Sequence, residues 1–124
     1  MEQEARRFTV EEANALLSSL EPILHRIRKA RQVVLKGGER IRESAMTDGG
    51  GKQDKAYWRA LESLRRDLEE VTGQGIILRD PETGLIDFPT MREGREVFLC
   101  WRLGEDAVAF WHGPESGFSG RRPL

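Results

Sequence analysis

An apolar repeat of seven residues in the first third of the chain limits its fold more than any other feature. Two series of positions carry it: Ala13, Leu20, Ile27, Val34 and Ile41, and Leu16, Ile23, Ala30, Gly37 and Ser44. The repeat keeps its phase across Pro22, which predicts one kinked but continuous helix over residues 10–45. Such a helix is about 54 Å long at 1.5 Å per residue, and a globular core with a radius of ~13 Å cannot cover it. Part of the helix must therefore protrude, or a partner must cover it.

The start of this helix is marked by a capping box. Thr9 is placed to accept a hydrogen bond from the backbone N–H of Glu12, whose side chain can reach back to the N–H of Thr9. Phe8 precedes the cap and is expected to pack on Ala13 as a hydrophobic staple.

A second helix is predicted over residues 53–72. Its apolar positions follow a heptad spacing: Tyr57, Leu61, Leu64, Leu68 and Val71. Gly73 stands where a C-terminal glycine cap is expected, and residues 47–52 have the composition of a loop. Because this loop is short, we expect the two helices to form a long antiparallel, coiled-coil-like hairpin.

The pattern changes to short apolar runs in the second half of the chain. Four short strands are predicted, over residues 76–78, 85–88, 96–102 and 107–111. Pro89 is expected to stop the second strand, and residues 90–94 to form a connector. Alternation along the third strand places Val97, Leu99, Trp101 and Leu103 on the face that packs on the helices.

These elements predict an α+β fold in a single domain over residues 1–124. The helical hairpin occupies residues 8–73, and a small antiparallel β element with its tail occupies residues 74–124. The tail, residues 113–124, is rich in glycine, proline and arginine, and is expected to be irregular.

Composition narrows the class of protein. The chain has 124 residues and a formal net charge of −1, so its overall charge favours neither nucleic acid nor a membrane surface. It has one cysteine, which excludes an intrachain disulfide and agrees with a reducing compartment. The charged N-terminus does not have the pattern of a secretory signal, and no segment has the ~20 apolar residues of a membrane helix. A cytoplasmic location is therefore expected.

Five motifs in order resemble a known family. They are FTVEEANALL (residues 8–17), GLIDFP (84–89), EVFLCWR (96–102), the pair Trp111 and His112, and GFSGRRP (117–123). Together they resemble the prokaryotic family called domain of unknown function 2203, over nearly the whole chain. The resemblance implies a small bacterial or archaeal cytoplasmic protein. It implies no activity, and no site residue follows from it.

A catalytic or metal site is not expected from the residue spacing. If residues 105–106 form a two-residue turn, Cys100 lies opposite Trp111 and Leu99 opposite His112, so the cysteine and the histidine point to opposite faces. A shift of one residue in this register would bring them together. No metal-ligand spacing is present, and no metal or cofactor is predicted, although Asp87, His112 and Glu115 could still converge.

A small-ligand binding protein or an undiscovered enzyme is one alternative function. Arginines beside aromatic walls would suit an anion, and the candidate residues are Arg102, Trp111, His112, Glu115 and Arg121. The simpler interpretation is that the aromatic residues form core and that the arginines hold the tail in place.

Nucleic-acid binding through the first helix is a second alternative. Seven basic residues lie between His25 and Arg42 with only Glu39 opposing them: Arg26, Arg28, Lys29, Arg31, Lys36, Arg40 and Arg42. They surround the helix rather than forming one face, which favours a solvated or ion-paired helix.

The preferred hypothesis is a non-enzymatic protein-interaction module that self-associates as a dimer. The heptad repeat, the excess helix length and the lack of a catalytic constellation support it. The expected shared surface is Leu16, Leu20, Ile23, Ile27 and Val34, with these residues divided between packing within the chain and between chains.

Overall fold

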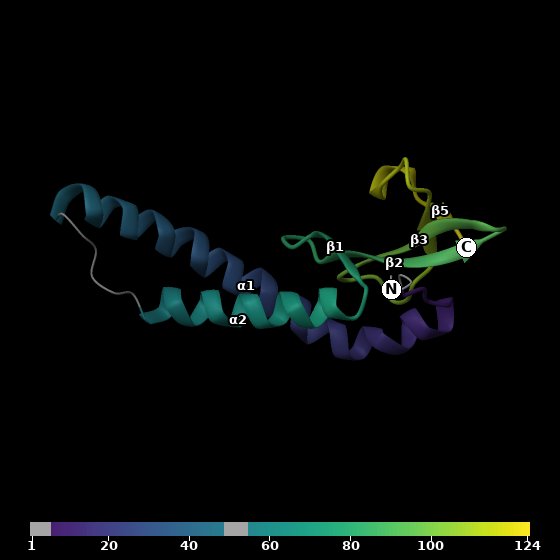
Figure 1. Ribbon diagram of the computed structural model, residues 1–124, viewed down its shortest axis with the longest axis horizontal. Coiled ribbons are helices and arrows are strands. Elements are labelled where there is room, and N and C mark those ends of the chain that lie inside the picture. The colour runs from purple at the N-terminus through teal and green to yellow at the C-terminus, as the bar shows by residue number, and fades with distance from the viewer. Residues whose placement is uncertain (1–5, 49–54) are drawn as a thin grey trace, which may run out of the picture.

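The structure, a computed structural model, describes residues 6–48 and 55–124, with the side chains of the first helix described as far as residue 43. Two helices come first, α1 (Val10–Asp48) and α2 (Lys55–Gly73), and an antiparallel sheet of five strands follows them. The strands are β1 (Ile77–Asp80), β2 (Leu85–Arg92), β3 (Arg95–Arg102), β4 (Phe110–His112) and β5 (Arg122–Pro123), with a 3-10 turn, η1 (Phe118–Gly120), before β5. The α+β class is confirmed (Figure 1).

The long first helix begins at the capping box and continues through its proline. The backbone N–H of Thr9 donates to Glu12 Oε1 over 2.8 Å, and the N–H of Glu12 donates to Thr9 Oγ1 over 3.0 Å. Phe8 is buried, and its ring meets the ring of Phe88 edge-on with centroids 5.2 Å apart. Pro22 lies inside α1 without ending it, as the unbroken phase of the repeat predicted.

The second helix runs back along the first. Arg26 of α1 binds Asp67 of α2, and Gly37, further along α1, faces Tyr57 near the start of α2. Residue numbers therefore rise along one helix as they fall along the other, and the two helices are antiparallel neighbours (Figure 1). Most of the predicted loop, residues 49–52, lies outside the described residues.

The approach of α2 to α1 at Gly37 gives a test by paired substitutions. A Cβ at Gly37 would lie 2.8 Å from Cδ2 of Tyr57, whereas a Cβ at Gly38 would meet only Arg42 Nη1, at 3.8 Å. Alanine is the better helix former, so Gly38→Ala should raise the free energy of unfolding by ~0.5–1 kcal/mol. Gly37→Ala gains the same propensity but must displace the tyrosine, so it should be at least ~1 kcal/mol less stable than Gly38→Ala. Urea unfolding checks this; equal gains at both positions would contradict the close approach.

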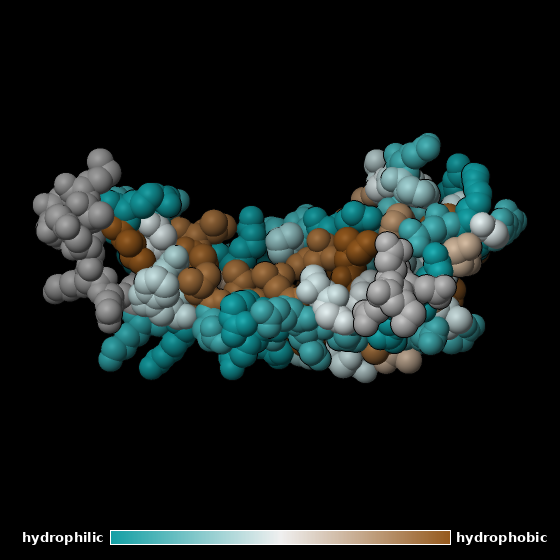
Figure 2. All heavy atoms as spheres, in the orientation of Figure 1, coloured by the Kyte–Doolittle hydropathy of each residue, from teal (hydrophilic) through white to brown (hydrophobic). Residues whose placement is uncertain are grey.

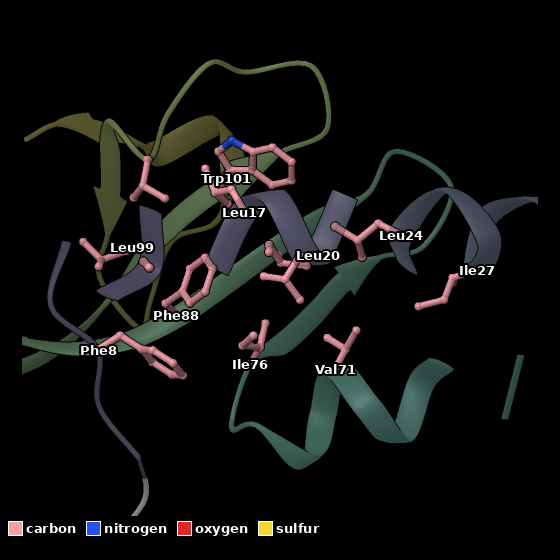
Figure 3. Packing of buried hydrophobic residues seen from close by; sticks show 13 residues of the cluster. Phe8, Leu17, Leu20, Leu24, Ile27, Val71, Ile76, Phe88, Leu99 and Trp101 are labelled. Carbon is pink, nitrogen blue, oxygen red and sulfur yellow. The ribbon is translucent and has the colours of Figure 1, made fainter. Parts of the chain in front are cut away.

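The core lies between the N-terminal half of α1, the end of α2 and one face of the sheet. Figure 3 shows its side chains converging from these elements: Phe8, Leu17, Leu20, Leu24, Ile27, Val71, Ile76, Phe88, Leu99 and Trp101. All are buried. The predicted helix-facing side of this strand is confirmed for Leu99 and Trp101, which belong to the same core cluster as Leu17 and Leu20 of α1, and Val97 is buried as well.

The second strand differs from its prediction, because it continues through Pro89 to Arg92. The carbonyl of Pro89 accepts from the N–H of Phe8, so this edge of the proline faces away from β3. Strand β1 pairs with β2 only as far as Asp87, so the missing N–H of the proline costs no bond in the sheet. The expected connector over residues 90–94 is instead a two-residue turn, in which Glu93 and Gly94 both have positive φ angles (53° and 77°).

The end of the chain also differs from its prediction. Strand β4 begins at Phe110 rather than at 107, and Phe98 pairs with His112, Leu99 with Trp111 and Cys100 with Phe110. This register is one residue away from the expected one, because the loop before β4 does not close as a tight turn. The tail is not wholly irregular: Arg122 and Pro123 pair with β4 and form a fifth strand.

Candidate functional site

Three side chains with metal-ligating or catalytic chemistry meet on the face of the sheet that points away from the helices. Asp87 of β2 lies directly opposite Cys100 of β3, and Phe98, two residues before Cys100, lies opposite His112 of β4. Because alternate residues share a face, the register places the carboxylate, the thiol and the imidazole together. All three residues are buried, and their ligand atoms lie within 4.8 Å of one another.

Hydrogen bonds hold the carboxylate and the imidazole in place. Asp87 Oδ2 lies 2.7 Å from His112 Nε2 and accepts a bond of 2.7 Å from Nε of Arg79, which comes from β1. Nδ1 of His112 lies 2.8 Å from the carbonyl oxygen of Gly113. The imidazole also stacks on Phe98, with ring centroids 5.4 Å apart. The sheet and these contacts fix the orientation of both groups.

The thiol of Cys100 is not an activated nucleophile in this setting. Burial raises its pKa to about 12, and the negative charge of Asp87 adds to the rise. A thiol with so high a pKa is protonated at neutral pH, whereas nucleophilic cysteines depend on the thiolate. Cys100 and His112 therefore lie close together, but the thiol does not have the lowered pKa that a catalytic cysteine needs.

The C-terminal tail covers part of this face. Arg121 makes two hydrogen bonds to Glu105, of 2.9 and 2.8 Å, and its guanidinium lies over the rings of Phe110 and Phe118. Arg102, the last residue of β3, also lies over the ring of Phe118, with its guanidinium carbon 4.6 Å from the ring centroid. These contacts anchor η1 to the sheet, as the simpler interpretation of the arginines predicted.

The pair formed by Arg121 and Glu105 predicts a pH dependence. Hydrogen bonds from Arg121 hold the pKa of the Glu105 carboxyl below its ordinary value. A carboxyl with a lowered folded-state pKa stabilises the fold above its unfolded pKa, and this contribution is lost as the pH falls through the folded pKa. Glu105→Gln should therefore be less stable than wild type at pH 7, with a difference that shrinks between about pH 5 and pH 3. Urea unfolding at several pH values checks this, with the exposed Glu115→Gln as control; a difference independent of pH would contradict it.

The residues expected to bind an anion do not form one cluster. Trp111 and Glu115 line an open groove of about 1010 Å³, whereas His112 lies in the buried cluster on the opposite face, and Arg102 and Arg121 hold the tail. Arg92 and Arg122 flank the ring of Trp111, with guanidinium carbons 4.8 and 5.4 Å from its centroid. The groove lining carries three arginines and three glutamates: Arg92, Arg95, Arg122, Glu93, Glu96 and Glu115. This balance of charge does not make an anion clamp.

Comparison with known proteins places the chain in a family. A family model described as an uncharacterized conserved protein, DUF2203, matches residues 6–124. The chain belongs to the DUF2203 family. No curated protein and no solved structure matches it.

The residues expected at an oligomer interface fall into two groups in this DUF2203 fold. Leu20 and Ile27 are fully buried inside the chain, so a partner cannot reach them without opening the core. Leu16 and Ile23 pack against that core but keep some exposed surface, and Val34 is half-buried further along α1.

Part of the basic stretch of α1 is neutralised within the DUF2203 chain. Arg26 makes two hydrogen bonds of 3.0 Å to Asp67, and Arg28 and Arg31 form ion pairs of 3.8 and 3.2 Å with Glu82 in the turn after β1. At least three of the seven basic side chains are thus engaged by acids, which reduces the charge available to meet a phosphate backbone. Among the described helices, neither combines the length and the apolar character that crossing a membrane requires.

Sequence reasoning missed Arg79. It left open that Asp87 and His112 converge with Glu115, and the structure brings these two together with Cys100 instead, while Glu115 lines the groove. Asp87 stands between Ile86 and Phe88 in an otherwise apolar strand, which was a signal that a buried carboxylate needs partners. The partners themselves depended on the register of β3 with β4, which the sequence did not determine.

Proposed function

We propose that this DUF2203 protein is a self-associating interaction module, in which the far half of the helical hairpin binds a second copy of the chain. The observation that carries the proposal is the lack of buried apolar side chains there. Up to residue 43 of α1 the last buried apolar residue is Ala30, and in α2 the described residues before Val71 include none. The far half of the hairpin, defined as residues 31–43 and 55–64, is thus two helices without a third layer.

Apolar side chains are nevertheless frequent in the far half of the hairpin. They are Val33, Val34, Leu35 and Ile41 on α1, and Tyr57, Trp58, Leu61 and Leu64 on α2. Leu35 and Trp58 are 52% and 53% exposed, the largest values among the exposed large apolar side chains of the described chain. Figure 2 shows apolar surface along the stretch between the far end of the hairpin and the sheet. Exposed apolar patches of this kind mark interaction surfaces in soluble proteins.

Leu35 continues the side of α1 that faces the sheet. It follows Leu24, Arg28 and Arg31 at intervals of three or four residues, which places all four on one face of the helix. Leu24 lies in the core, and Arg28 and Arg31 bind Glu82 at the edge of the β element. Beyond that edge the same face has no sheet to cover it, so Leu35 remains exposed.

The charges of the hairpin favour a second copy in the opposite direction. When Arg31 and Asp67 are set aside, because they pair with Glu82 and Arg26 within the chain, residues 31–43 of α1 carry three basic and two acidic side chains, whereas residues 62–70 of α2 carry three acidic and two basic ones. A two-fold axis across the hairpins would set the basic far end of each copy against the acidic region of the other. The heptad spacing of both helices suits a coiled-coil-like four-helix arrangement of this kind.

Sedimentation velocity of the wild-type protein over a range of concentrations tests the proposal. The chain has a mass of 14.2 kDa, and we expect a species of twice this mass at micromolar concentration that dissociates on dilution. A protein that sediments as a monomer throughout this range would overturn the proposal.

A further inference from the structure

The buried cluster of Asp87, Cys100 and His112 has the chemistry and the rigidity of a metal-binding site, and self-association makes no use of it. The three residues come from neighbouring strands of one sheet, so the backbone hydrogen bonds of the sheet fix their positions. Their oxygen, sulfur and nitrogen ligand atoms lie within 4.8 Å of one another, and all three side chains are buried. Three different donor types held this close together resemble the ligand set of a transition metal.

An unpartnered carboxylate oxygen points to a missing cation. Within residues 6–43 and 55–124, Oδ1 of Asp87 is the one buried side-chain oxygen or nitrogen without a hydrogen-bond partner. Asp87 itself is 0% exposed. A buried carboxylate normally satisfies both oxygens, because an unpaired one has lost its water without replacement. A cation bound by the cluster would provide the partner that Oδ1 lacks.

The orientation of His112 points the same way. Its Nδ1 lies 2.8 Å from the carbonyl oxygen of Gly113, which can only accept, so Nδ1 carries the proton of that bond. Nε2 then faces Oδ2 of Asp87 at 2.7 Å, a distance bridged by a shared proton in the metal-free protein, and loss of that proton would free the Nε2 lone pair to bind a metal ion. A histidine ligand that donates its other ring nitrogen to a backbone carbonyl is the usual arrangement in metal sites.

We propose that Asp87, Cys100 and His112 bind one zinc ion, with the fourth coordination position left open. Zinc accepts this mixture of carboxylate, thiolate and imidazole ligands, and three protein ligands with one open position are typical of its reactive sites. On binding, the thiol proton and the proton between His112 and Asp87 pass to the solvent. The resulting carboxylate, thiolate, neutral imidazole and Zn²⁺ sum to zero charge, and the guanidinium of the partly exposed Arg79 adds one positive charge beside Asp87.

Arg79 is the positioning residue of the site. Its Nε donates to Asp87 Oδ2 over 2.7 Å, and its guanidinium lies 5.1 Å from the centroid of the Phe98 ring, which in turn stacks on His112. Its own side chain is 43% exposed, so it can be replaced without opening the core. Loss of such an outer contact typically weakens metal binding ~10–100-fold.

The test uses untagged wild-type protein, stripped of metal with a chelator and titrated with Co²⁺ and then with Zn²⁺. Cys100 is the only cysteine of the chain, so a thiolate-to-cobalt charge-transfer band in the near ultraviolet can only report on this residue. We expect the band to saturate at one Co²⁺ per chain and to disappear on addition of one equivalent of Zn²⁺. A titration without this band would overturn the proposal.

Three variants test whether the metal binds at this cluster, and circular dichroism separates a loss of binding from a loss of folding. Arg79→Met should bind Zn²⁺ ~10–100-fold more weakly than wild type in competition with a chelating dye, with an unchanged far-ultraviolet circular dichroism spectrum. Cys100→Ser should abolish the cobalt band; if this variant does not fold, the wild-type band and Arg79→Met still decide. His25→Gln removes the other histidine of the chain and is the matched control. A Zn²⁺ affinity that falls in His25→Gln and stays constant in Arg79→Met would overturn the assignment.

Discussion

Replacing Trp101 with alanine should lower the free energy of unfolding by about 3–5 kcal/mol. Trp101 is fully buried in the core between α1 and the sheet, and its Nε1 donates a hydrogen bond of 3.1 Å to the carbonyl of Glu105. The substitution leaves a large cavity and removes the partner of that carbonyl. Since domains of this size are stable by only ~5–15 kcal/mol, the variant should lose much of its stability.

Urea unfolding followed by far-ultraviolet circular dichroism measures this effect, because the signal does not depend on the tryptophan. Met91→Ala is the matched control, since Met91 is 47% exposed near the turn between β2 and β3. We expect this control to remain within ~0.5 kcal/mol of wild type. A Trp101→Ala protein with the stability of the control would show that the sheet does not pack on α1 as described.

Introducing glutamate at both Leu35 and Trp58 should weaken self-association by roughly 100-fold or more. Both side chains are exposed apolar groups on the far half of the hairpin, and aromatic anchors at the centre of interfaces often cost 2 kcal/mol or more when removed, where ~1.4 kcal/mol is tenfold in affinity. Buried carboxylates would add a desolvation penalty. Sedimentation velocity should show the dimer of the wild type replaced by a monomer at the same concentration.

The control for this variant places a single glutamate on the β element instead of the hairpin. Met91→Glu converts an exposed apolar residue of the sheet, far along the chain from the hairpin, and should leave the dimer intact. Loss of the dimer in Met91→Glu but not in the hairpin variant would move the interface to the β element.

The helices could be predicted from the sequence because their signals are local. The capping box at Thr9 and Glu12 and the repeat that keeps its phase across Pro22 each determine their part of α1 without reference to distant residues. The sequence did not show that Leu20 and Ile27 are buried within the chain rather than exposed to a partner. The apolar stripe to which they belong faces α2, the sheet and solvent at different points along α1.

The β element was harder to predict because its strands depend on pairing. Pro89 remains in β2 only because its edge without an N–H faces the N-terminal segment rather than β3. The tail forms β5 only because Arg122 and Pro123 pair with β4. Both facts depend on contacts between segments distant in the sequence.

The candidate metal site shows the same limit more sharply. Cys100 and His112 were assigned to opposite faces on the assumption of a two-residue turn, and the register observed, Phe98 with His112, reverses that assignment. One residue of loop length therefore decides whether Asp87, Cys100 and His112 form a cluster. Asp87 within an apolar strand was the only local signal that such a cluster exists.

Site-specific photo-cross-linking at position 35 can show whether the far half of the hairpin binds a second copy of the chain. A photoreactive amino acid replaces Leu35, and unlabelled chains are mixed with ¹⁵N-labelled chains so that mass spectrometry separates cross-links between copies from those within one. We expect cross-links from position 35 to the helical hairpin of the second copy, on α1 or α2. Cross-links confined to one chain, or leading to the β element of the second copy, would contradict it.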